Sequence, residues 1–520
     1  MSVTVEQLLA LPGLEKATVE GDGTTVIDSV SLDSSAVTAG GLFAALPGTR
    51  THGAEYAAQT QASAILSDAA GRDILQAAGE SRPLLIVDDL RAVLGTIAAE
   101  VYGHPTDELT VIGITGTSGK TTTSYLLETG LLHAGYSVGL IGTTGTRINR
   151  EPVPTKLTTP EAPKLQELFA LMRDKGVTHV VMEVSSHALS LGRVQGTRFA
   201  AAGFTNLSQD HLDFHPTMED YFDAKALLFD GPGAAERAVI CVDDEWGERM
   251  VERARAHRLP TDTVTTKQTG EETSEITARQ LSVEPTGAQQ VRFDFAAGLR
   301  ERAGRSGLEF RLPMPGEFNI ANAALATGLG SAVGVEVPAF VEGMSEVAVP
   351  GRMERIDRGQ DFIAVVDYAH KPAAIAAVLD TLRTQLGESG RIGVVVGAGG
   401  DRDSAKRPIM GRNAAERADL VVVTDDNPRT EDPATIRAAV LEGAREGANA
   451  ATRAVDVREE GSRAAAIDAA VAWAGPGDAV IVVGKGHEVG QIIGTETHHF
   501  DDREELARAL EEKQAGTLGA

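Results

Sequence analysis

Short apolar runs alternate with helix-length amphipathic segments along most of the chain. In residues 106–347 these runs are LTVIGI, THVVMEV, AAAGFTN and AVICVDD, and in residues 348–520 they are FIAVVDYAH, RIGVVVGAGG, DLVVVTDDNP and DAVIVVGKGH. Such runs are typical of buried parallel strands, and the segments between them are typical of helices that cover a sheet. The pattern predicts an α/β protein with two mostly parallel sheets, the second of them doubly wound like a Rossmann domain.

The first 105 residues show a weaker form of the same pattern. The runs GLFAAL, SAILSD and LLIVDD are broken by Gly, Pro and Thr and precede a helix-like segment, LRAVLGTIAAEVYG. We therefore expect three domains, over residues 1–105, 106–347 and 348–520, in agreement with a length of 520 residues. Residues 262–312 alternate apolar with polar positions and predict antiparallel strands or an irregular excursion.

Polar residues that could bind ligands or take part in catalysis follow the strongest predicted strands. They are EVSSH at 183–187, TN at 205–206, DYAH at 367–370, DDNPR at 425–429 and GKGHE at 484–488. Ligands of open parallel sheets bind at the carboxyl ends of the strands. Two such edges in one chain predict an active site in a cleft between domains.

A phosphate-binding loop follows the run LTVIGI. Its sequence is GITGTSGKTTT from Gly113 to Thr123, between that strand and a helix-like segment. Backbone N–H groups of the turn and Lys120 suit phosphate oxygens, and the Thr121 hydroxyl suits magnesium. The usual motif has its first glycine at the position of Ile114, so here the first glycine comes one residue early.

Composition and charge exclude several classes of protein. The formal net charge of -26 argues against a general nucleic-acid binder, which needs a basic face. The one cysteine, Cys241, cannot form an intramolecular disulfide, which fits a reducing cytoplasm. The N-terminal segment does not have the composition of a signal peptide, and no apolar run reaches the roughly 18 residues of a membrane span. We expect a cytoplasmic protein without membrane insertion, and a monomer by default.

Local context leaves several candidate residues with two interpretations. Glu183 ends a strand where NTPases supply an acid to magnesium, but it also fits a turn cap. The segment from Asn206 to His215 fits a solvent-facing turn and a magnesium ligand equally. Lys225 lies on a predicted amphipathic helix, where a lysine is normally a charge exposed to solvent.

Two further segments suit ligand binding. Asn319 and Asn322 lie three apart at the start of an Ala-rich helix, where both can face a ligand; a cap and a surface residue are the alternatives. The glycine turn before Arg402 ends in arginine where a dinucleotide fingerprint needs glycine, which suits an anionic substrate group better than a nicotinamide cofactor.

Taken in order, the motifs resemble those of the Mur ligase family. They are TGTSGKTT, EVSSH, TNLSQDHLD, the helix with Lys225, GEFNIANA, GRMER, DYAH, GGDRD, DNPR and GKGHE. The resemblance spans Leu32 to Glu488 and implies the three-domain architecture of that family: a small α/β domain, a central ATPase-like sheet and a Rossmann-like domain. Within the family, the chain is most similar to members that add diaminopimelate to UDP-N-acetylmuramoyl-alanyl-glutamate.

The resemblance implies an ATP site and a magnesium site. ATP is expected at Gly116, Thr117, Ser118, Gly119, Lys120, Thr121, Thr122, Asn322, Arg352 and Asp367. Magnesium is expected at Thr121, Glu183, His211 and Lys225. The family carbamylates the lysine that matches Lys225, which turns a cation into a ligand for magnesium.

The resemblance also assigns two substrate sites. The nucleotide-sugar dipeptide is expected at Leu32, Ser34, Thr49, Arg50, Thr51, Thr158, Thr159, Ser185 and Arg193. Leu191 stands where some members carry a glutamine, so no contact is assigned to it. Diaminopimelate is expected at Arg402, Asp426, Asn427, Pro428, Arg429, Gly484 and Glu488. The arginines suit its carboxylates and the acids suit its ammonium groups, whereas lysine has no distal carboxylate to pair with an arginine.

We expect the substrate carboxylate to attack ATP and form an acyl phosphate, which the amine then attacks. Lys120, Lys225 and His370 are the catalytic candidates, and no residue is an obvious base for the amine. Three other interpretations stay open: a lysine- or ornithine-adding ligase, a folylpolyglutamate-type synthetase, and a nucleotide-driven ATPase switch. The N-terminal domain and the DNPR segment argue against the synthetase.

Overall fold

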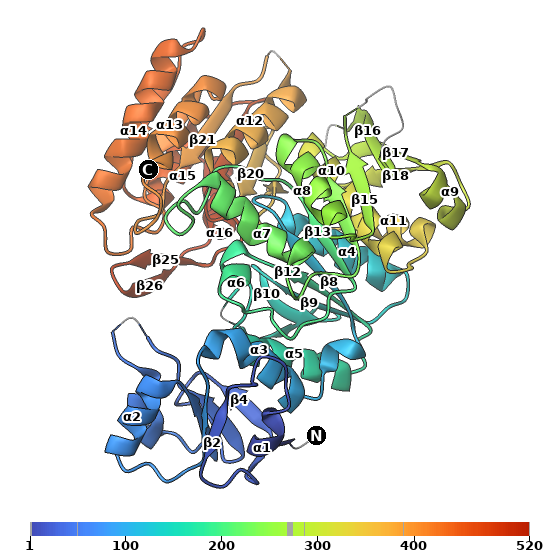
Figure 1. Cartoon of the computed structure of the whole chain (residues 1–520). Coiled ribbons are helices and arrows are strands. Elements are labelled where there is room, and N and C mark those ends of the chain that lie inside the picture. Colours follow the sequence, from blue (N-terminus) through green and yellow to red (C-terminus); the bar gives the residue numbers. More distant parts are fainter. Residues whose placement is uncertain are drawn as a thin grey trace.

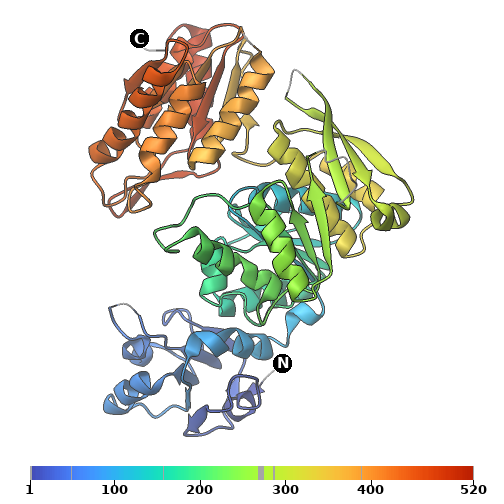
Figure 2. The same cartoon turned by 45° about the horizontal axis from the view of Figure 1, so that its top comes forward.

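The computed structural model describes residues 3–48, 50–155, 157–267, 274–284, 287–387 and 389–518. Thr49, one of the residues predicted to bind the nucleotide sugar, lies outside these ranges. Three large sheets follow one another along the chain. In Figures 1 and 2, the central sheet lies between an N-terminal unit, in blue, and a C-terminal unit, in orange and red. The predicted α/β class is confirmed.

The N-terminal unit contains a five-stranded sheet in the order β2-β7-β6-β5-β4. Its strands are β2 (Thr18–Glu20), β4 (Ser29–Ser31), β5 (Gly41–Ala44), β6 (Ala64–Ser67) and β7 (Leu84–Ile86). β2 is antiparallel to β7, and the other pairs are parallel. Because side chains alternate along a strand, Leu66 packs with helix α3 (Leu90–Val101), while Ile65 packs with helix α2 (Ala69–Ala77).

Three short elements and a 3-10 turn complete the N-terminal unit. They are β1 (Val3–Thr4), α1 (Val5–Leu8), β3 (Val26–Ile27) and η1 (Gly53–Gln59). Thr4 caps α1 through a capping box with Gln7, which fixes the direction of the chain at its start.

The central unit contains an 11-stranded sheet. Its parallel part runs β9 (Val138–Gly142), β12 (His179–Glu183), β8 (Thr110–Thr115), β13 (Ala201–Phe204), β14 (Ala238–Cys241), β15 (Thr261–Thr265) and β16 (Ile276–Val283). β10 (Gly145–Ile148) and β11 (Glu151–Val153) extend one edge as antiparallel strands. The strands predicted from LTVIGI, THVVMEV, AAAGFTN and AVICVDD are β8, β12, β13 and β14.

Helices cover both faces of the central sheet. One face carries α4 (Lys120–His133), α10 (Glu317–Ala332) and α11 (Val337–Met344). The other carries α5 (Ala162–Asp174), α7 (Met218–Asp230) and α8 (Glu245–Ala256), while α6 (Ser186–Ser190) follows β12. The neighbours Val111 and Ile112 point to opposite cores, so β8 is buried on both faces and reads as a continuous apolar run.

The polar segment of residues 262–312 begins in the parallel strand β15 and, from β16 onward, extends the central sheet with antiparallel pairs. β17 (Gln289–Phe295) pairs with β16 and with β18 (Gly307–Leu312), and α9 (Ala297–Ala303) connects β17 to β18. Along β17 buried residues alternate with half-buried ones, because one face of these strands packs on the core. Of the two interpretations offered by the sequence, the antiparallel strands are confirmed for the described part of this segment.

The C-terminal unit contains a six-stranded sheet in the order β19-β20-β24-β21-β22-β23. The strands are β19 (Glu354–Arg355), β20 (Ile363–Asp367), β21 (Ile392–Val396), β22 (Leu420–Val423), β23 (Asp456–Glu459) and β24 (Ala479–Val483). α12 (Pro372–Leu386), α13 (Lys406–Arg417) and α14 (Pro433–Ala450) cover one face, and α15 (Arg463–Trp473) and α16 (Asp502–Ala515) cover the other. β19 is the one antiparallel strand of the six.

A two-stranded hairpin, β25 (Gly490–Ile493) and β26 (Glu496–His499), projects from the C-terminal unit. In the part of the chain that the structure describes, no helix combines the length and the apolar character needed to cross a membrane.

Candidate active site

A cleft of about 980 Å³ lies between the central and C-terminal sheets, at the carboxyl ends of strands from both. Most of the site residues predicted from the sequence line it. They are Thr117, Ser118, Gly119, Lys120, Thr121, Thr122, Thr158, Thr159, Glu183, Ser185, Arg193, His211, Asn322, Arg352, Asp367, His370, Arg402, Asp426, Asn427, Arg429, Gly484 and Glu488. Packing thus brings together residues up to 371 positions apart, from Thr117 to Glu488.

The phosphate loop connects β8 to α4, as its strand-turn-helix sequence predicts. Gly116 and Gly119 have φ of 140° and 93°, which L side chains rarely adopt. The Asn206 side chain fixes the loop: its Oδ1 accepts from Ser118 N at 3.0 Å and its Nδ2 donates to Ser118 O at 3.1 Å. The loop is therefore held by the segment that follows β13.

Three lysines donate to two consecutive carbonyl groups of the phosphate loop. Lys120 Nζ lies 2.8 Å from Gly116 O, Lys225 Nζ lies 2.8 Å from the same oxygen, and Lys371 Nζ lies 3.0 Å from Thr117 O. Burial lowers the pKa of Lys120 to about 8, and the Lys371 charge contributes. So many cations around one loop favour an anionic ligand.

The expectation that Lys225 is a solvated charge is wrong. Its side chain is 1% exposed, because α7 packs under the phosphate loop, and its ammonium lies over the Tyr221 ring. Burial, followed by the charges of Lys120 and Lys371, holds the pKa of Lys225 well below its usual range. Burial therefore favours the uncharged form of the Lys225 amine, and that form is the nucleophilic one.

The residues expected to hold magnesium surround the phosphate loop. Glu183 is fully buried, and its carboxylate accepts from Thr143 N and Oγ1, both at 2.9 Å. His211 Nε2 lies 3.2 Å from Asp210, and burial lowers the pKa of His211 to about 3. Among the described residues, no three His, Cys, Asp or Glu side chains form a ready metal site. Oxygen donors beside a phosphate loop fit magnesium that arrives with a nucleotide.

The C-terminal unit contributes side chains to the nucleotide end of the cleft. Arg352 Nη2 donates to Thr121 Oγ1 at 3.1 Å, and its guanidinium stacks on Tyr368. The Asp367 carboxylate accepts from Met353 N and Ala369 N, both at 2.7 Å. Burial raises the pKa of Asp367. Arg352 thus joins the two units directly at the phosphate loop.

The two asparagines of α10 bond to each other. Asn322 Nδ2 donates to Asn319 Oδ1 at 3.3 Å, and Asn319 Nδ2 donates to Pro315 O at 2.7 Å. Asn322 Oδ1 also accepts from Thr123 Oγ1 at 3.4 Å. Asn319 therefore supports Asn322, which lies against the phosphate loop. The alternative that Asn319 caps the helix is wrong, because the N-cap of α10 is Gly316 and, among the described residues, no side chain caps it.

At the other end of the cleft, Asp426 and Glu488 lie around the buried ammonium of Lys485. Lys485 Nζ is 3.5 Å from Asp426 and 3.8 Å from Glu488, and it donates to Asn427 Oδ1 at 2.8 Å. Asn427 Nδ2 donates to Glu488 at 3.0 Å. Burial and the Asp426 charge raise the pKa of Glu488. Asp426 and Glu488 can pair with an ammonium group of a ligand, and Lys485 and Arg429 are cations that already act on Glu488.

Arg429, a half-buried residue, faces the glycine turn before Arg402. Its Nη1 donates to Gly400 O at 2.7 Å, and its backbone has φ of 52°. Arg402 lines the cleft and is exposed to solvent. Pro428 is buried and does not line the cleft. Gly484 has φ of 120°, and a Cβ there would lie 2.6 Å from Asp426. Only glycine fits beside that carboxylate.

The residues predicted to bind the nucleotide sugar are only partly brought together. Thr158, Thr159, Ser185 and Arg193 line the cleft, with Arg193 paired to Glu161 at 2.8 Å. Leu32, Ser34, Arg50 and Thr51 lie on the N-terminal unit, outside that lining. A substrate that reaches both must extend from the cleft onto the N-terminal unit.

His370 lies in the cleft as a neutral imidazole. Its Nδ1 lies 2.8 Å from Tyr368 O, so Nδ1 carries the proton and Nε2 keeps its lone pair. Burial, together with the charges of Lys371 and Lys406, lowers its pKa to about 3. His370 is a weak proton acceptor.

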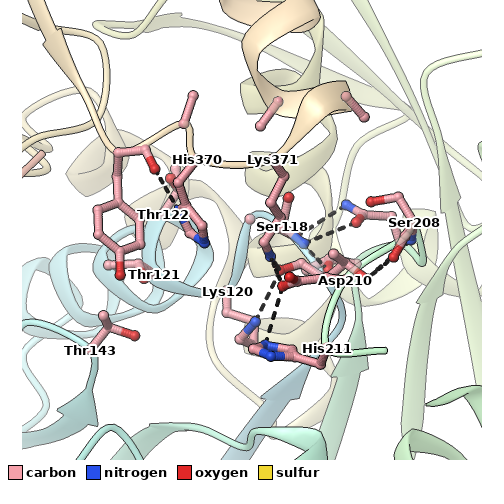
Figure 3. A pocket seen from close by; sticks show the side chains of 18 of the residues that line it. Ser118, Lys120, Thr121, Thr122, Thr143, Ser208, Asp210, His211, His370 and Lys371 are labelled. Carbon is pink, nitrogen blue, oxygen red and sulfur yellow. Dashed lines mark hydrogen bonds and ion pairs between the residues drawn. The ribbon is translucent and has the colours of Figure 1, made fainter. Parts of the chain in front are cut away.

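Several side chains that shape the cleft were not predicted from the sequence. Thr143 holds Glu183, Lys485 holds Asn427, and Lys371 contacts the loop. Figure 3 shows Thr143 and Lys371 in the cleft. Only Lys485 lies inside a motif that the sequence singled out, GKGHE. The others follow from contacts between distant segments, which leave no local pattern.

Three family models match most of the chain. "Mur ligase middle domain" matches residues 114–330, "Mur ligase, glutamate ligase domain" residues 351–486, and "Mur ligase family, catalytic domain" residues 26–102. A Corynebacterium glutamicum relative is 60% identical over 497 residues, which are 94% of this chain and 93% of that protein. The chain belongs to the Mur ligase family.

Two relatives of this Mur ligase and one solved structure share a name. The C. glutamicum protein and a Corynebacterium efficiens protein are both named UDP-N-acetylmuramoyl-L-alanyl-D-glutamate--2,6-diaminopimelate ligase. The second is 58% identical and covers 100% of this chain and 97% of its own. A solved structure with the same name is 29% identical, has a TM-score of 0.67, and is matched over 99% of this chain and 100% of its own.

Proposed function

We propose that this Mur ligase uses ATP to join meso-diaminopimelate to the glutamyl residue of UDP-N-acetylmuramoyl-L-alanyl-D-glutamate in peptidoglycan precursor synthesis. One observation carries the function: a single cleft is lined by Lys120 of the phosphate loop and by Arg429 and Glu488 of the opposite sheet. Relatives with this activity in their names support the choice of substrates. We expect the enzyme to work as a cytoplasmic monomer.

The reaction has two chemical steps. The γ-carboxylate of the glutamyl residue attacks the γ-phosphorus of ATP, so that an acyl phosphate forms and ADP leaves. An amino group of diaminopimelate then attacks the acyl carbon, the amide bond forms, and phosphate leaves with the proton of the amine going to solvent. The pKa of about 3 at His370 favours phosphate oxygens over this imidazole as the first proton acceptor.

Positioning and charge neutralisation are the main work of the protein. We assign the ATP phosphates to residues 116–122, which include Lys120 and Thr121, and the rest of the nucleotide to Asn322, Arg352 and Asp367. The contact between Arg352 and Thr121 supports this assignment, because it joins the two units where the phosphates would lie.

Magnesium would be held by Thr121, Glu183, His211 and a carbamylated Lys225, and it would neutralise charge on the transferred phosphoryl group. The buried amine of Lys225 supports the modification. Carbamylation joins the neutral amine to CO₂ and releases a proton, which gives a carboxylate-like group. This step needs an uncharged amine, and the burial that lowers the pKa of Lys225 favours that form.

Diaminopimelate would bind where Asp426, Glu488 and Arg429 converge. The two acids suit an ammonium group, and Arg429 and Arg402 suit the carboxylate that lysine lacks. An arginine left without its carboxylate costs about 1–3 kcal/mol, so selection against lysine should be strong. Asn427, Pro428 and Gly484 would shape this site.

The nucleotide-sugar end of the other substrate would extend onto residues 1–105, with contacts to Leu32, Ser34, Thr49, Arg50 and Thr51. Its peptide end would contact Thr158, Thr159, Ser185 and Arg193 in the cleft. The presence of these last four residues in the cleft lining supports this direction.

A substrate panel tests the proposed function. Phosphate release and product mass are measured with ATP, magnesium and UDP-muramoyl dipeptide, and with meso-diaminopimelate, lysine or ornithine. Of the three diamino acids, we expect only meso-diaminopimelate to support turnover. The variant Arg429→Ala should raise the KM for diaminopimelate about ten- to hundredfold, whereas Arg412→Ala, at an exposed arginine paired with Glu446, should leave it unchanged. A preference for lysine or ornithine would reject diaminopimelate as the amino-acid substrate. ATP hydrolysis at the same rate with and without these substrates would indicate an ATPase switch.

The modification of Lys225 has its own measurement. ¹³C NMR of protein incubated with ¹³C-bicarbonate should show a carbamate signal that is lost in Lys225→Arg. Removal of CO₂ should lower the rate of the wild-type enzyme, and bicarbonate should restore it. A wild-type rate that does not depend on CO₂ would contradict the modification.

A further inference from the structure

Lys371 connects the C-terminal unit to the phosphate loop. It precedes α12, and its Nζ donates to Thr117 O at 3.0 Å and lies 2.8 Å from Asp210 Oδ2. The side chain of Lys371 is 10% exposed and that of Asp210 is 4% exposed. Figure 3 shows Lys371 extending from the C-terminal unit to Asp210 beside Ser118. Lys371 therefore makes one hydrogen bond and one ion pair across the boundary between the units.

Asp210 belongs to a segment that is tied to the phosphate loop. Several hydrogen bonds join this segment, between β13 and α7, to the loop: Thr117 N donates to Asn206 O at 2.9 Å, Ser118 N to Asn206 Oδ1 at 3.0 Å, and Ser208 N to Thr117 Oγ1 at 3.1 Å. Lys371 therefore contacts one assembly at two places, once at the loop and once at the segment that holds it.

The surroundings of Asp210 make its contact with Lys371 depend on how the two units sit against each other. Lys371 is its nearest cation at 2.8 Å, Lys406 of α13 lies at 3.9 Å, and the His211 imidazole, at 3.2 Å, has a pKa lowered to about 3. A buried carboxylate that loses its partner is strongly unfavourable, whereas separation of the units would return both groups to water. The ion pair therefore penalises intermediate positions in which Asp210 stays buried and Lys371 is displaced.

We propose that Lys371 is a positioning residue for the ligase reaction, a role that rests on the proposed function. Its ammonium fixes the C-terminal unit against Asp210 and the Thr117 carbonyl, which sets the distance between the amino-acid end of the cleft and the phosphate loop. Lys371 acts through these two groups and does not need to touch a substrate. The chain places its neighbour Pro372 at the first position of α12, so the backbone that carries Lys371 is stiff.

Kinetics of Lys371→Met test this role. We expect kcat to fall on the order of ten- to hundredfold, because misplacement of reacting groups acts on the bound complex. The KM for ATP should change less than about threefold, since Lys120 and the loop glycines remain. Lys371→Arg should recover part of kcat. A kcat within twofold of the wild type in Lys371→Met would overturn the inference.

Two further variants separate this contact from general effects of charge. Lys406→Met removes the more distant lysine and should cost less than Lys371→Met. Asp210→Asn should lower kcat, and the double variant with Lys371→Met should be no slower than the slower single variant, because both remove one contact. Independent, additive losses would overturn the inference.

Small-angle X-ray scattering gives a measurement that does not require turnover. Wild-type protein with a non-hydrolysable ATP analogue should have a smaller radius of gyration than Lys371→Met under the same conditions, while the melting temperatures stay similar. Equal radii would reject the role of Lys371. Failure of the wild type to form the tripeptide product would instead reject the proposed function, so the two failures are distinguishable.

Discussion

Gly119 shows how single residues shape the phosphate loop. It is the N-cap of α4 with φ of 93°, and a Cβ there would lie 2.4 Å from Asn322 Oδ1. Both the left-handed backbone and this close approach need a residue without a side chain. Asn322 can approach the loop only because position 119 is glycine.

The substitution Gly119→Ala should therefore impair ATP binding more than stability. We expect the KM for ATP to rise at least about tenfold, and the free energy of unfolding to fall by roughly 1–3 kcal/mol from backbone strain. Gly145→Ala is the matched control, because Gly145 has φ of 96° and no heavy atom near its Cβ position. It should share the loss of stability and keep the KM for ATP. Equal effects on KM would show that strain alone matters.

At the scale of elements, one buried ion pair joins α15 to α16. Arg463 and Asp502 are both 0% exposed and 2.7 Å apart, and Arg463 also donates to Val483 O at the end of β24 at 2.9 Å. The two helices and the strand meet directly below Gly484 and Asp426. Their packing sets the position of that end of the cleft.

Removal of one partner should be costly, because the other charge stays buried. We expect Asp502→Ala to lower the free energy of unfolding by about 3–5 kcal/mol. Asp468→Ala breaks a partly exposed pair with Arg508 and should cost about 0–1 kcal/mol. Urea unfolding followed by tryptophan fluorescence measures both. A similar small loss in the two variants would show that the buried pair contributes little.

For the whole molecule, buried histidines connect stability to pH. His179 begins β12 against the Tyr136 ring, and burial lowers its pKa from 6.5 to about 4. Between these values the unfolded chain binds a proton that the folded protein does not. The contribution of His179 is therefore complete above pH 6.5 and is lost as the pH falls toward 4.

The variant His179→Phe should flatten the pH dependence of stability. Between pH 6.5 and 4.5 the free energy of unfolding of the variant should fall less steeply than that of the wild type. The two slopes should differ by up to about 1.4 kcal/mol per pH unit. Comparison with the wild type is needed, because the raised pKa values of Asp367 and Glu488 act in the opposite direction. His498→Phe, at an exposed histidine, should leave the slope unchanged. Equal slopes for all three proteins would contradict the lowered pKa of His179.

The sequence by itself determined the features that depend on neighbouring residues. The run LTVIGI, the glycine turn and the helix after Lys120 predicted β8, the phosphate loop and α4, because strand and helix periods and backbone freedom are local properties. The same holds for β20, β21, β22 and β24. Their polar ends were correctly expected at one cleft, since parallel strands end at the same edge of a sheet.

Only the tertiary structure decided which charges are buried and which groups meet. The pattern around Lys225 predicted an amphipathic helix with a solvated lysine, but α7 also packs against the phosphate loop, so the amine is buried. Lys371 and Asp210 are distant in the chain, and their ion pair exists because two sheets pack against each other. Solvent exposure and pKa depend on that packing, which no short segment of sequence contains.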